Sequence, residues 1–302
     1  MATIITPAVI TALFTSWNAD FQKGLTGAKP QYQKICMVVK STTASNTYGW
    51  LGKFPNLREW VGDRVIKSMK AHGYTISNKT FESTVGVGRD DIEDDNVGVY
   101  SPVFEEMGRA VEIQPDELAF GLLKAGTSTL CYDGQNYFDT DHPVYPNVDG
   151  TGTAESVSNY DDNGGSGTTW YLLDTSRAVK PVIFQDRRKP NLQSMTKLDD
   201  EKVFTSNEFR FGADCRRNVG FSFWQLAYAS RKELNSDNLW AAITAMREYE
   251  ADGGQKLGVK PTLIVVPPGL EKQATRMLER ELDSNSSNEL KGRLELVVAD
   301  YL

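Results

Sequence analysis

YSPVFEEMGRAVEIQPDELAFGLLKAG, residues 100–126, is the stretch that decides the fold of this chain. Ser101 suits a helix N-cap and Pro102 suits the first helical turn. Apolar side chains then recur at the three- and four-residue spacing of one buried helix face. Pro115 cannot donate the backbone hydrogen bond that a helix needs, and it disfavours helical geometry in the residue before it. The pattern therefore predicts two helices in tandem, broken at Pro115 and ended at Gly126.

The composition is that of an ordinary globular protein with an acidic surplus. The 302 residues include 33 Lys and Arg against 40 Asp and Glu, which gives a formal net charge of −7. Tight nucleic-acid binding depends on cationic side chains that neutralise phosphates, so this balance argues against it. No apolar run approaches the roughly 20 residues that span a bilayer, and the N-terminal segment lacks the basic start of a signal peptide. Cys36, Cys131 and Cys215 form no CxxC motif, and we expect free thiols in a reducing compartment.

The region before residue 100 predicts one helix followed by short strands. Residues 7–24 carry apolar side chains near one helical face, and such a terminal helix packs either on its own domain or on a neighbouring copy. Residues 35–39 predict an apolar strand. Residues 72–90 alternate in the manner of two short strands, with a turn at Asn78-Lys79.

Two tryptophans in this region, Trp50 and Trp60, lie near glycines where apolar periodicity is weak. Either they pack locally, or they belong to a projecting loop that is buried on another subunit. Aromatic side chains are favoured anchors at protein interfaces, so both interpretations stay open.

The second half of the chain predicts a loop, a strand-rich block and an α/β block. Residues 147–169 are almost entirely Gly, Asn, Asp, Ser and Thr, which is typical of a long mobile loop or a boundary. Residues 170–230 contain several short apolar or alternating runs that predict strands. Residues 236–302 predict helix, strand, helix and strand in alternation. Within them LIVV at 263–266 is typical of a strand covered on both faces.

An acidic run and two basic clusters are candidate sites for ions or charged partners. Asp91, Glu93 and Asp95 have the alternate spacing of a calcium loop, but Asn96 stands where that loop requires Gly, and no Glu closes it. The run is therefore expected to be solvated or to face a basic partner. The basic clusters at 187–189 and 216–217 are likewise expected to be solvated or to face acidic groups.

The densest group of metal-ligand residue types lies at 131–143, CYDGQNYFDTDHP. Asp133, Asp139, Asp141 and His142 would be the residues of a metal-dependent hydrolase, which needs about three ligands and an open position. Asp and His in polar turns more often make local hydrogen bonds. No phosphate-binding glycine motif is present. We therefore predict no catalytic residues, no cofactor site and no metal site, and keep the hydrolase as an alternative.

Long and specific stretches carry a family resemblance. They include SNTYGWLGKFPNLREWVGDR, GRDDIEDDNVGVYSP, CYDGQNYFDTDHPVYPNVDGTG and KLGVKPTLIVVPPGLEKQA, and the similarity runs from ITPAVI near the N-terminus to the terminal VVADYL. The chain resembles the major head (capsid) proteins of the transposable phage Mu and its relatives. That resemblance implies an α+β chain with the Hong Kong 97 phage capsid fold.

The resemblance also implies an order of structural regions. Residues 1–46 would form an extended N-terminal arm, and residues 47–99 would hold the E-loop, which lies across a neighbouring subunit. Residues 100–235 would form a peripheral domain with a long spine helix and the flexible loop 147–169. Residues 236–302 would form the axial domain around the hexamer and pentamer axes.

In function, the resemblance implies a major capsid protein, not an enzyme, that self-assembles into the icosahedral head shell around phage double-stranded DNA. The expected partners are copies of itself, a scaffold protein, the portal and, as a further candidate, decoration proteins, with no sequence-specific DNA contact and no membrane. The expected location is the virion, after assembly in the bacterial host cytoplasm. Some shells of this fold carry Lys–Asn cross-links, but Lys53, Lys67 and Lys70 match no such motif, and none is predicted. Another virion component, such as a tail-sheath or decoration protein, is the remaining alternative.

Overall fold

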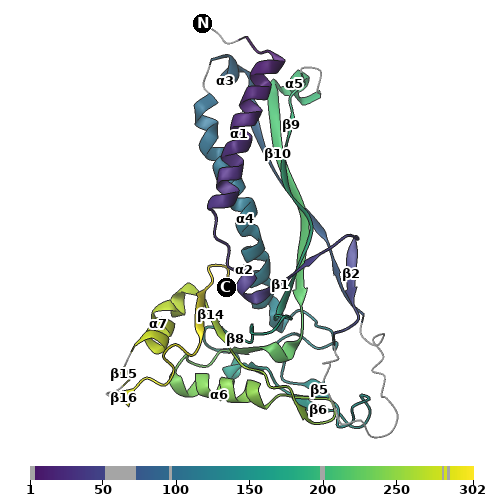
Figure 1. Cartoon of the computed structure of the whole chain (residues 1–302), viewed down its shortest axis with the longest axis vertical. Helices are drawn as coiled ribbons and strands as arrows, with labels where there is room; N and C mark the ends of the chain where they lie inside the picture. Colours follow the sequence, from purple (N-terminus) through teal and green to yellow (C-terminus); the bar gives the residue numbers. More distant parts are fainter. Residues whose placement is uncertain (1–3, 52–72, 95–96, 198–200, 281, 284–285) are drawn as a thin grey trace.

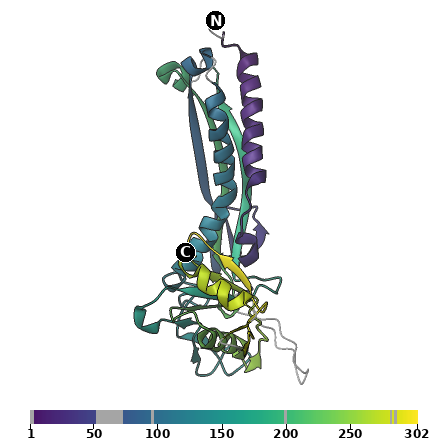
Figure 2. The same ribbon diagram turned by 90° about the vertical axis from the view of Figure 1, so that its left-hand side faces the viewer.

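The chain forms an elongated molecule with a narrow upper part and a wider lower lobe (Figures 1 and 2). The computed structural model describes residues 4–51, 73–94, 97–197, 201–280, 282–283 and 286–302. In the upper part, two long helices lie beside a long twisted sheet. In the lower lobe, a second sheet carries two shorter helices (Figure 1).

The α-helices differ widely in length. They are α1 Pro7–Gly27, α2 Tyr32–Ile35, α3 Arg89–Glu93, α4 Ser101–Lys124, α5 Glu201–Ser206, α6 Ser236–Glu248 and α7 Glu271–Glu279. A 3-10 turn, Val97–Tyr100, leads directly into α4, so Ser101 is the first helical residue and not the cap. Among the described residues, no helix is both long and apolar enough to cross a bilayer.

Two sheets organise the strands. The four-stranded sheet has the order β1-β9-β10-β4. Its strands are β1 Cys36–Lys40, β4 Lys79–Gly88, β9 Val182–Met195 and β10 Glu208–Phe221. The five-stranded sheet has the order β17-β14-β8-β11-β7. Its strands are β7 Tyr160–Asp161, β8 Trp170–Leu173, β11 Ala227–Ser230, β14 Leu263–Val266 and β17 Glu295–Val298.

The remaining strands form two-stranded pairs. These are β2 Ser45–Tyr48 with β3 Tyr74–Ser77, β5 His142–Val144 with β6 Glu155–Val157, β12 Glu250–Ala251 with β13 Gln255–Lys256, and β15 Leu282–Asp283 with β16 Ser286–Ser287. The turn predicted at Asn78-Lys79 does not join a hairpin, because β3 pairs with β2 while β4 pairs with β10. Asn78 instead marks the point where the chain passes from one sheet to the other, and its backbone N–H donates to the carbonyl of Ala44.

The upper part is held by an apolar layer between the two long helices and the long sheet. Along β10, alternate residues are buried, as expected of a strand with one covered face. Trp17 of α1 stacks on Phe104 of α4 with ring centroids 5.0 Å apart, and both rings meet Phe211 of β10 edge-on. The terminal helix therefore packs on its own chain, and residues 7–27 are helical where the resemblance implied an extended arm.

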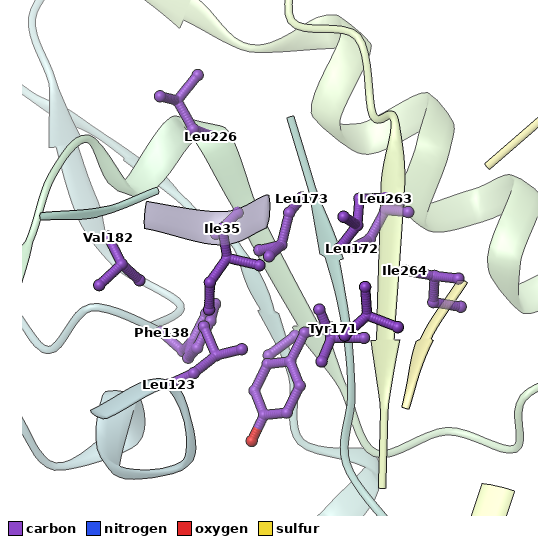
Figure 3. Packing of buried hydrophobic residues seen from close by; sticks show 14 of the residues in the cluster. Ile35, Leu123, Phe138, Tyr171, Leu172, Leu173, Val182, Leu226, Leu263 and Ile264 are labelled. Carbon is purple, nitrogen blue, oxygen red and sulfur yellow. The ribbon is translucent and has the colours of Figure 1, made fainter. Parts of the chain in front are cut away.

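The lower lobe has the larger core, built around the five-stranded sheet. All four residues of β14 are buried, which confirms the strand predicted at 263–266. Leu172 and Leu173 of β8 lie beside Leu263 and Ile264 in the middle of this core (Figure 3). The strand-rich segment 170–230 thus divides between the two sheets, and the domain boundary expected before residue 236 cuts across the five-stranded sheet.

Two other predictions for the second half of the chain need correction. Residues 147–169 are not a plain loop, because they contain β6, β7 and the fully buried Asn159. The second helix predicted within residues 236–302, with Leu282 on its apolar face, instead ends with α7 at Glu279, and Leu282 begins β15. The three cysteines are all free and buried, as predicted.

The predicted break at Pro115 is wrong, because α4 is a single helix of 24 residues with Pro115 inside it. The proline leaves the carbonyl of Val111 without its helical N–H donor. Arg217 of β10 fills that vacancy: its Nη2 donates to Val111 O at 2.6 Å, and its Nε donates to Gln114 Oε1 at 2.8 Å. A guanidinium from the sheet thus replaces the hydrogen bond that the helix lacks.

The residue after the proline, Asp116, binds the start of α2. The Asp116 carboxylate accepts hydrogen bonds from the backbone N–H groups of Gln31 and Tyr32, the latter at 2.6 Å. The proline turn of α4 is therefore tied both to the long sheet and to the segment that enters β1.

We expect Arg217→Ala to lower the free energy of unfolding by about 2 kcal/mol, because two partly buried acceptors lose their donor. Replacing Pro115 by Ala returns an N–H to the helix, so in a Pro115→Ala background the loss from Arg217→Ala should shrink by about 1 kcal/mol. Urea unfolding of the four proteins of this double-mutant cycle, followed by circular dichroism, measures both values. An equal loss in the two backgrounds would show that Arg217 does not act through Val111.

Candidate functional site

Carboxylates of the acidic run at 89–95 contact neighbouring residues of the same chain. Residues 89–93 form α3, in which Arg89 Nε pairs with Glu93 Oε1 at 2.9 Å. The hydroxyl of Tyr100 donates to Asp91 Oδ2 at 2.6 Å. Asp95 and Asn96 lie outside the described residues. The described carboxylates thus serve the helix and its neighbours and do not converge as calcium ligands would.

The structure brings together a different set of polar residues, at the base of the lobe. His142, at the first position of β5, is fully buried, and its Nδ1 lies 2.7 Å from Asp133 Oδ2. Its Nε2 lies 3.2 Å from Asn159 Oδ1, and its ring stacks on the indole of Trp224 with centroids 4.2 Å apart. The thiol of Cys131 donates to the other oxygen of Asp133 at 3.0 Å.

A tight turn holds Asp133 in this position. Gly134 has φ +90°, a value that glycine adopts without strain. The turn is closed by hydrogen bonds from the backbone N–H of Gln135 to Asp133 Oδ1 and from the N–H of Cys131 to the Gln135 carbonyl. The turn thus aims the carboxylate inward at His142.

Asn159 fixes the other side of the imidazole, and nothing in the polar stretch around it marked it as a central residue. Its Nδ2 donates to the carbonyl of Tyr137 at 2.8 Å, and its Oδ1 accepts from the backbone N–H of Asp139 at 2.9 Å. These contacts set the orientation of the amide, so its oxygen faces His142 Nε2.

Both ring nitrogens of His142 therefore face oxygen atoms, Nδ1 the carboxylate of Asp133 and Nε2 the amide oxygen of Asn159. Burial opposes ionisation of Asp133, but the hydrogen bonds from His142 and Cys131 outweigh it and lower the pKa of this carboxyl. Burial, with the adjacent carboxylate, raises the pKa of the Cys131 thiol and keeps it protonated. The two side chains have the geometry of a buried ion pair, and each polar atom of the pair has a hydrogen-bond partner.

The cluster predicted from the sequence is only partly assembled. Asp133 and His142 come together, but Asp139 and Asp141 do not join them, and Cys131 takes their place. The Asp139 carboxylate accepts from the backbone N–H groups of Asn136 and Thr140, while Asp141 is exposed. The acidic pair was misplaced because spacing along the chain does not say which side of a turn each side chain occupies.

The distances within this cluster are those of hydrogen bonds. Two nitrogen or oxygen ligands of a tetrahedral zinc ion, each about 2.0–2.1 Å from the metal, stand about 3.3 Å apart. His142 Nδ1 and Asp133 Oδ2 are closer than that, at 2.7 Å. The absence of a metal stays a prediction. The hydrogen bonds of this cluster hold residues 131–142 against the core of the lobe.

Other sequence candidates lie apart from this cluster. Trp50 packs locally, meeting Tyr48 and Phe223 edge-on, whereas Trp60 lies outside the described residues. So do Lys53, Lys67 and Lys70. Of the basic clusters, Arg188 pairs with Asp214 on the sheet. Arg217, expected to be solvated or to face an acidic partner, is buried at the proline turn of α4 instead.

Comparison with known proteins shows a similarity to phage major head proteins over the whole chain. The profile of the family Mu-like prophage major head subunit gpT matches residues 10–302. The major capsid protein of Escherichia phage Mu is 62% identical over 304 residues, which cover 99% of this chain and all of that protein. A subunit from the procapsid of bacteriophage JBD30 is 55% identical with a TM-score of 0.86, over 99% of this chain and 100% of that one. A subunit from the JBD30 capsid decorated with minor capsid protein trimers is 41% identical with a TM-score of 0.76, over 99% and 100%.

Proposed function

Since this chain belongs to the family of Mu-like prophage major head subunits and is a phage major capsid protein, we propose that many copies of it, in hexamers and pentamers, close into an icosahedral shell around double-stranded DNA. The fold is the α+β Hong Kong 97 capsid fold, and the chain is a structural protein of the virion and not an enzyme. The hydrolase, tail-sheath and decoration alternatives find no support.

One observation carries the proposal: the similarity to subunits of assembled phage capsids extends over the whole chain at high identity. The net charge of −7 supports a shell that encloses DNA without holding it tightly, because tight binding requires a surplus of cationic side chains that neutralise phosphates.

We assign the parts of the molecule to roles in such a shell. The long sheet with α4 as its spine would be the peripheral domain, with α1 as an N-terminal arm folded back on it. The lobe built on the five-stranded sheet would be the axial domain, including β8 and β11 from before residue 236. The E-loop would lie within residues 47–99, of which residues 52–72 lie outside the described part of the chain.

A scaffold protein and a portal are the proposed assembly partners, and the bacterial cytoplasm is the proposed place of assembly. A decoration protein is a further candidate, because the related JBD30 capsid is decorated with trimers of a minor capsid protein.

Electron microscopy of this chain, co-expressed with the scaffold and protease genes of its phage, tests the proposal. We expect closed shells of uniform diameter. A parallel expression without the scaffold gene reports whether the scaffold is required. Only small soluble species, formed while the scaffold is demonstrably present, would contradict the proposal.

A further inference from the structure

One side of the lower lobe carries a stripe of cations. Lys272, Arg276 and Arg280 are exposed and follow one another at four-residue spacing along and just beyond α7, so they share one face of the helix. None of the three forms an ion pair with any residue that the structure describes. They border a hollow of about 570 Å³ that lies between α7 and the beginning of α6, with Asn235 and Ser236 on its far wall.

The other side of the lobe carries an exposed acidic turn. Asp139 and Asp141 precede β5, and the Asp139 carbonyl accepts hydrogen bonds from the backbone N–H of Asn159 and the hydroxyl of Ser158, beside β7. Neither carboxylate has a cation partner within the described part of the chain. A side-chain hydrogen bond with Asp139, together with the negative charge of that neighbour, raises the pKa of Asp141.

The two charged surfaces stand at opposite ends of one sheet. The strand β17, which α7 contacts, is the first in the order β17-β14-β8-β11-β7, and β7 is the last. α7 lies on the left of the lobe in Figure 1 and the β5–β6 pair on the right, while Figure 2, which views the left-hand side, places α7 in front. One copy thus presents a basic hollow on one flank and an acidic turn on the other.

We propose that the acidic turn Asp139–Asp141 of one copy docks against the basic stripe Lys272, Arg276 and Arg280 of the next copy around a capsomer. Identical subunits in a ring meet head to tail, so each contact joins two different surfaces of the same chain. Opposite charges on those surfaces favour this register and oppose the like-to-like arrangement. The proposal rests on the ring arrangement of the proposed function.

A second copy is a better occupant of the basic stripe than DNA. The stripe has three cations, and the same chain supplies an unpaired acidic counterpart on the opposite flank of the same sheet. DNA binding gains its strength from many phosphate contacts, and the chain as a whole is acidic. Contact with DNA is retained as an outcome of the test.

Charge reversal on each surface, alone and together, tests the pairing. Full-length Asp141→Arg, Arg276→Glu and the doubly reversed protein are each co-expressed with the scaffold, and capsomers and closed shells are quantified by sedimentation and electron microscopy. We expect each single reversal to lower the assembled fraction roughly tenfold or more, because like charges then face each other, and the double reversal to restore most of it. Asp141→Glu and Arg276→Lys keep the charges and should assemble as the unaltered chain does.

Circular dichroism melts show whether each variant is folded, which is expected because both side chains are exposed. Unimpaired assembly of the single reversals would overturn the proposal. The proposal would also be overturned if both single variants were impaired and the double variant were not rescued, since the two surfaces would then contact other partners and not each other. Normal shells that package less DNA only in Arg276→Glu would also overturn it and assign the stripe to DNA. If the unaltered chain forms capsomers but no closed shells, the proposed function is contradicted. The pairing of the two surfaces is then still tested by comparing the fraction of each variant that is found in capsomers.

Discussion

Replacing His142 by Ala is expected to lower the free energy of unfolding by about 3–5 kcal/mol, the loss typical of removing one partner of a buried ion pair. The buried carboxylate of Asp133 would lose the imidazole that contacts it at 2.7 Å, and the oxygen of Asn159 would lose its contact with Nε2. The indole of Trp224 would also lose the ring stacked on it. Guanidinium unfolding of the purified chain, followed by far-UV circular dichroism, measures the difference.

Asp141→Ala is the matched control, because it removes a charge from the neighbouring residue, which is exposed. Its expected effect on unfolding is within about 0.5 kcal/mol. Asp133→Asn should fall between the two variants, since the amide keeps an oxygen for His142 to donate to. If His142→Ala and Asp141→Ala unfold at the same denaturant concentration, the buried ion pair does not stabilise the lobe.

The contact between Asp133 and His142 should make the stability of the folded chain depend on pH. The pKa of Asp133 is lower in the folded chain than the roughly 3.9 of a free aspartate. The stabilisation is therefore complete above that value and is lost as the pH falls through the folded pKa. Because the hydrogen bond from His142 contributes to the lowered pKa, the unaltered chain should lose more stability than His142→Ala as the pH falls from about 4 through the folded pKa.

Much of the architecture could be predicted from local patterns. The terminal helix, the buried strand at 263–266 and the helix beginning at residue 236 each satisfy a period that a single segment reveals on its own. The family resemblance supplied the fold and the function, which no local motif indicated. The cap of α6 is Asn235, just outside the predicted block 236–302, because side-chain geometry decides which of several adjacent polar residues caps a helix.

The predictions that the structure corrects failed for one physical reason: each depends on a contact with a residue distant in sequence. Helix propensity predicts a break at Pro115, but Arg217, about a hundred positions later, donates the missing hydrogen bond. The polar stretch around Asn159 looks like a mobile loop until the carbonyls that its amide binds are brought beside it. The apparent hairpin at Asn78 fails because the longer strand β10 captures β4. In each case tertiary contacts override a local preference.

Gly108→Ala is expected to lower the free energy of unfolding by roughly 3 kcal/mol, the upper end of the range for overpacking. A Cβ at this position of α4 would lie 2.1 Å from the carbonyl oxygen of Phe21, and a Cβ at Gly24 of α1 would lie 1.9 Å from the carbonyl oxygen of Glu105. The two helices therefore cross through a pair of glycines with backbone against backbone, and neither obstacle is a side chain that can rotate away.

The added methyl group must separate α1 from α4, which pulls Trp17 and Phe21 out of the upper core. Hydrogen exchange of the α1 amides should rise in Gly108→Ala and in Gly24→Ala alike. The double variant should cost less than the sum of the two, because a single separation relieves both clashes. Gly121→Ala, in the same helix with nothing within 4 Å of its Cβ, should instead stabilise the chain by about 0.5–1 kcal/mol. If Gly108→Ala matched Gly121→Ala, the close crossing would not be what holds α1 against the spine.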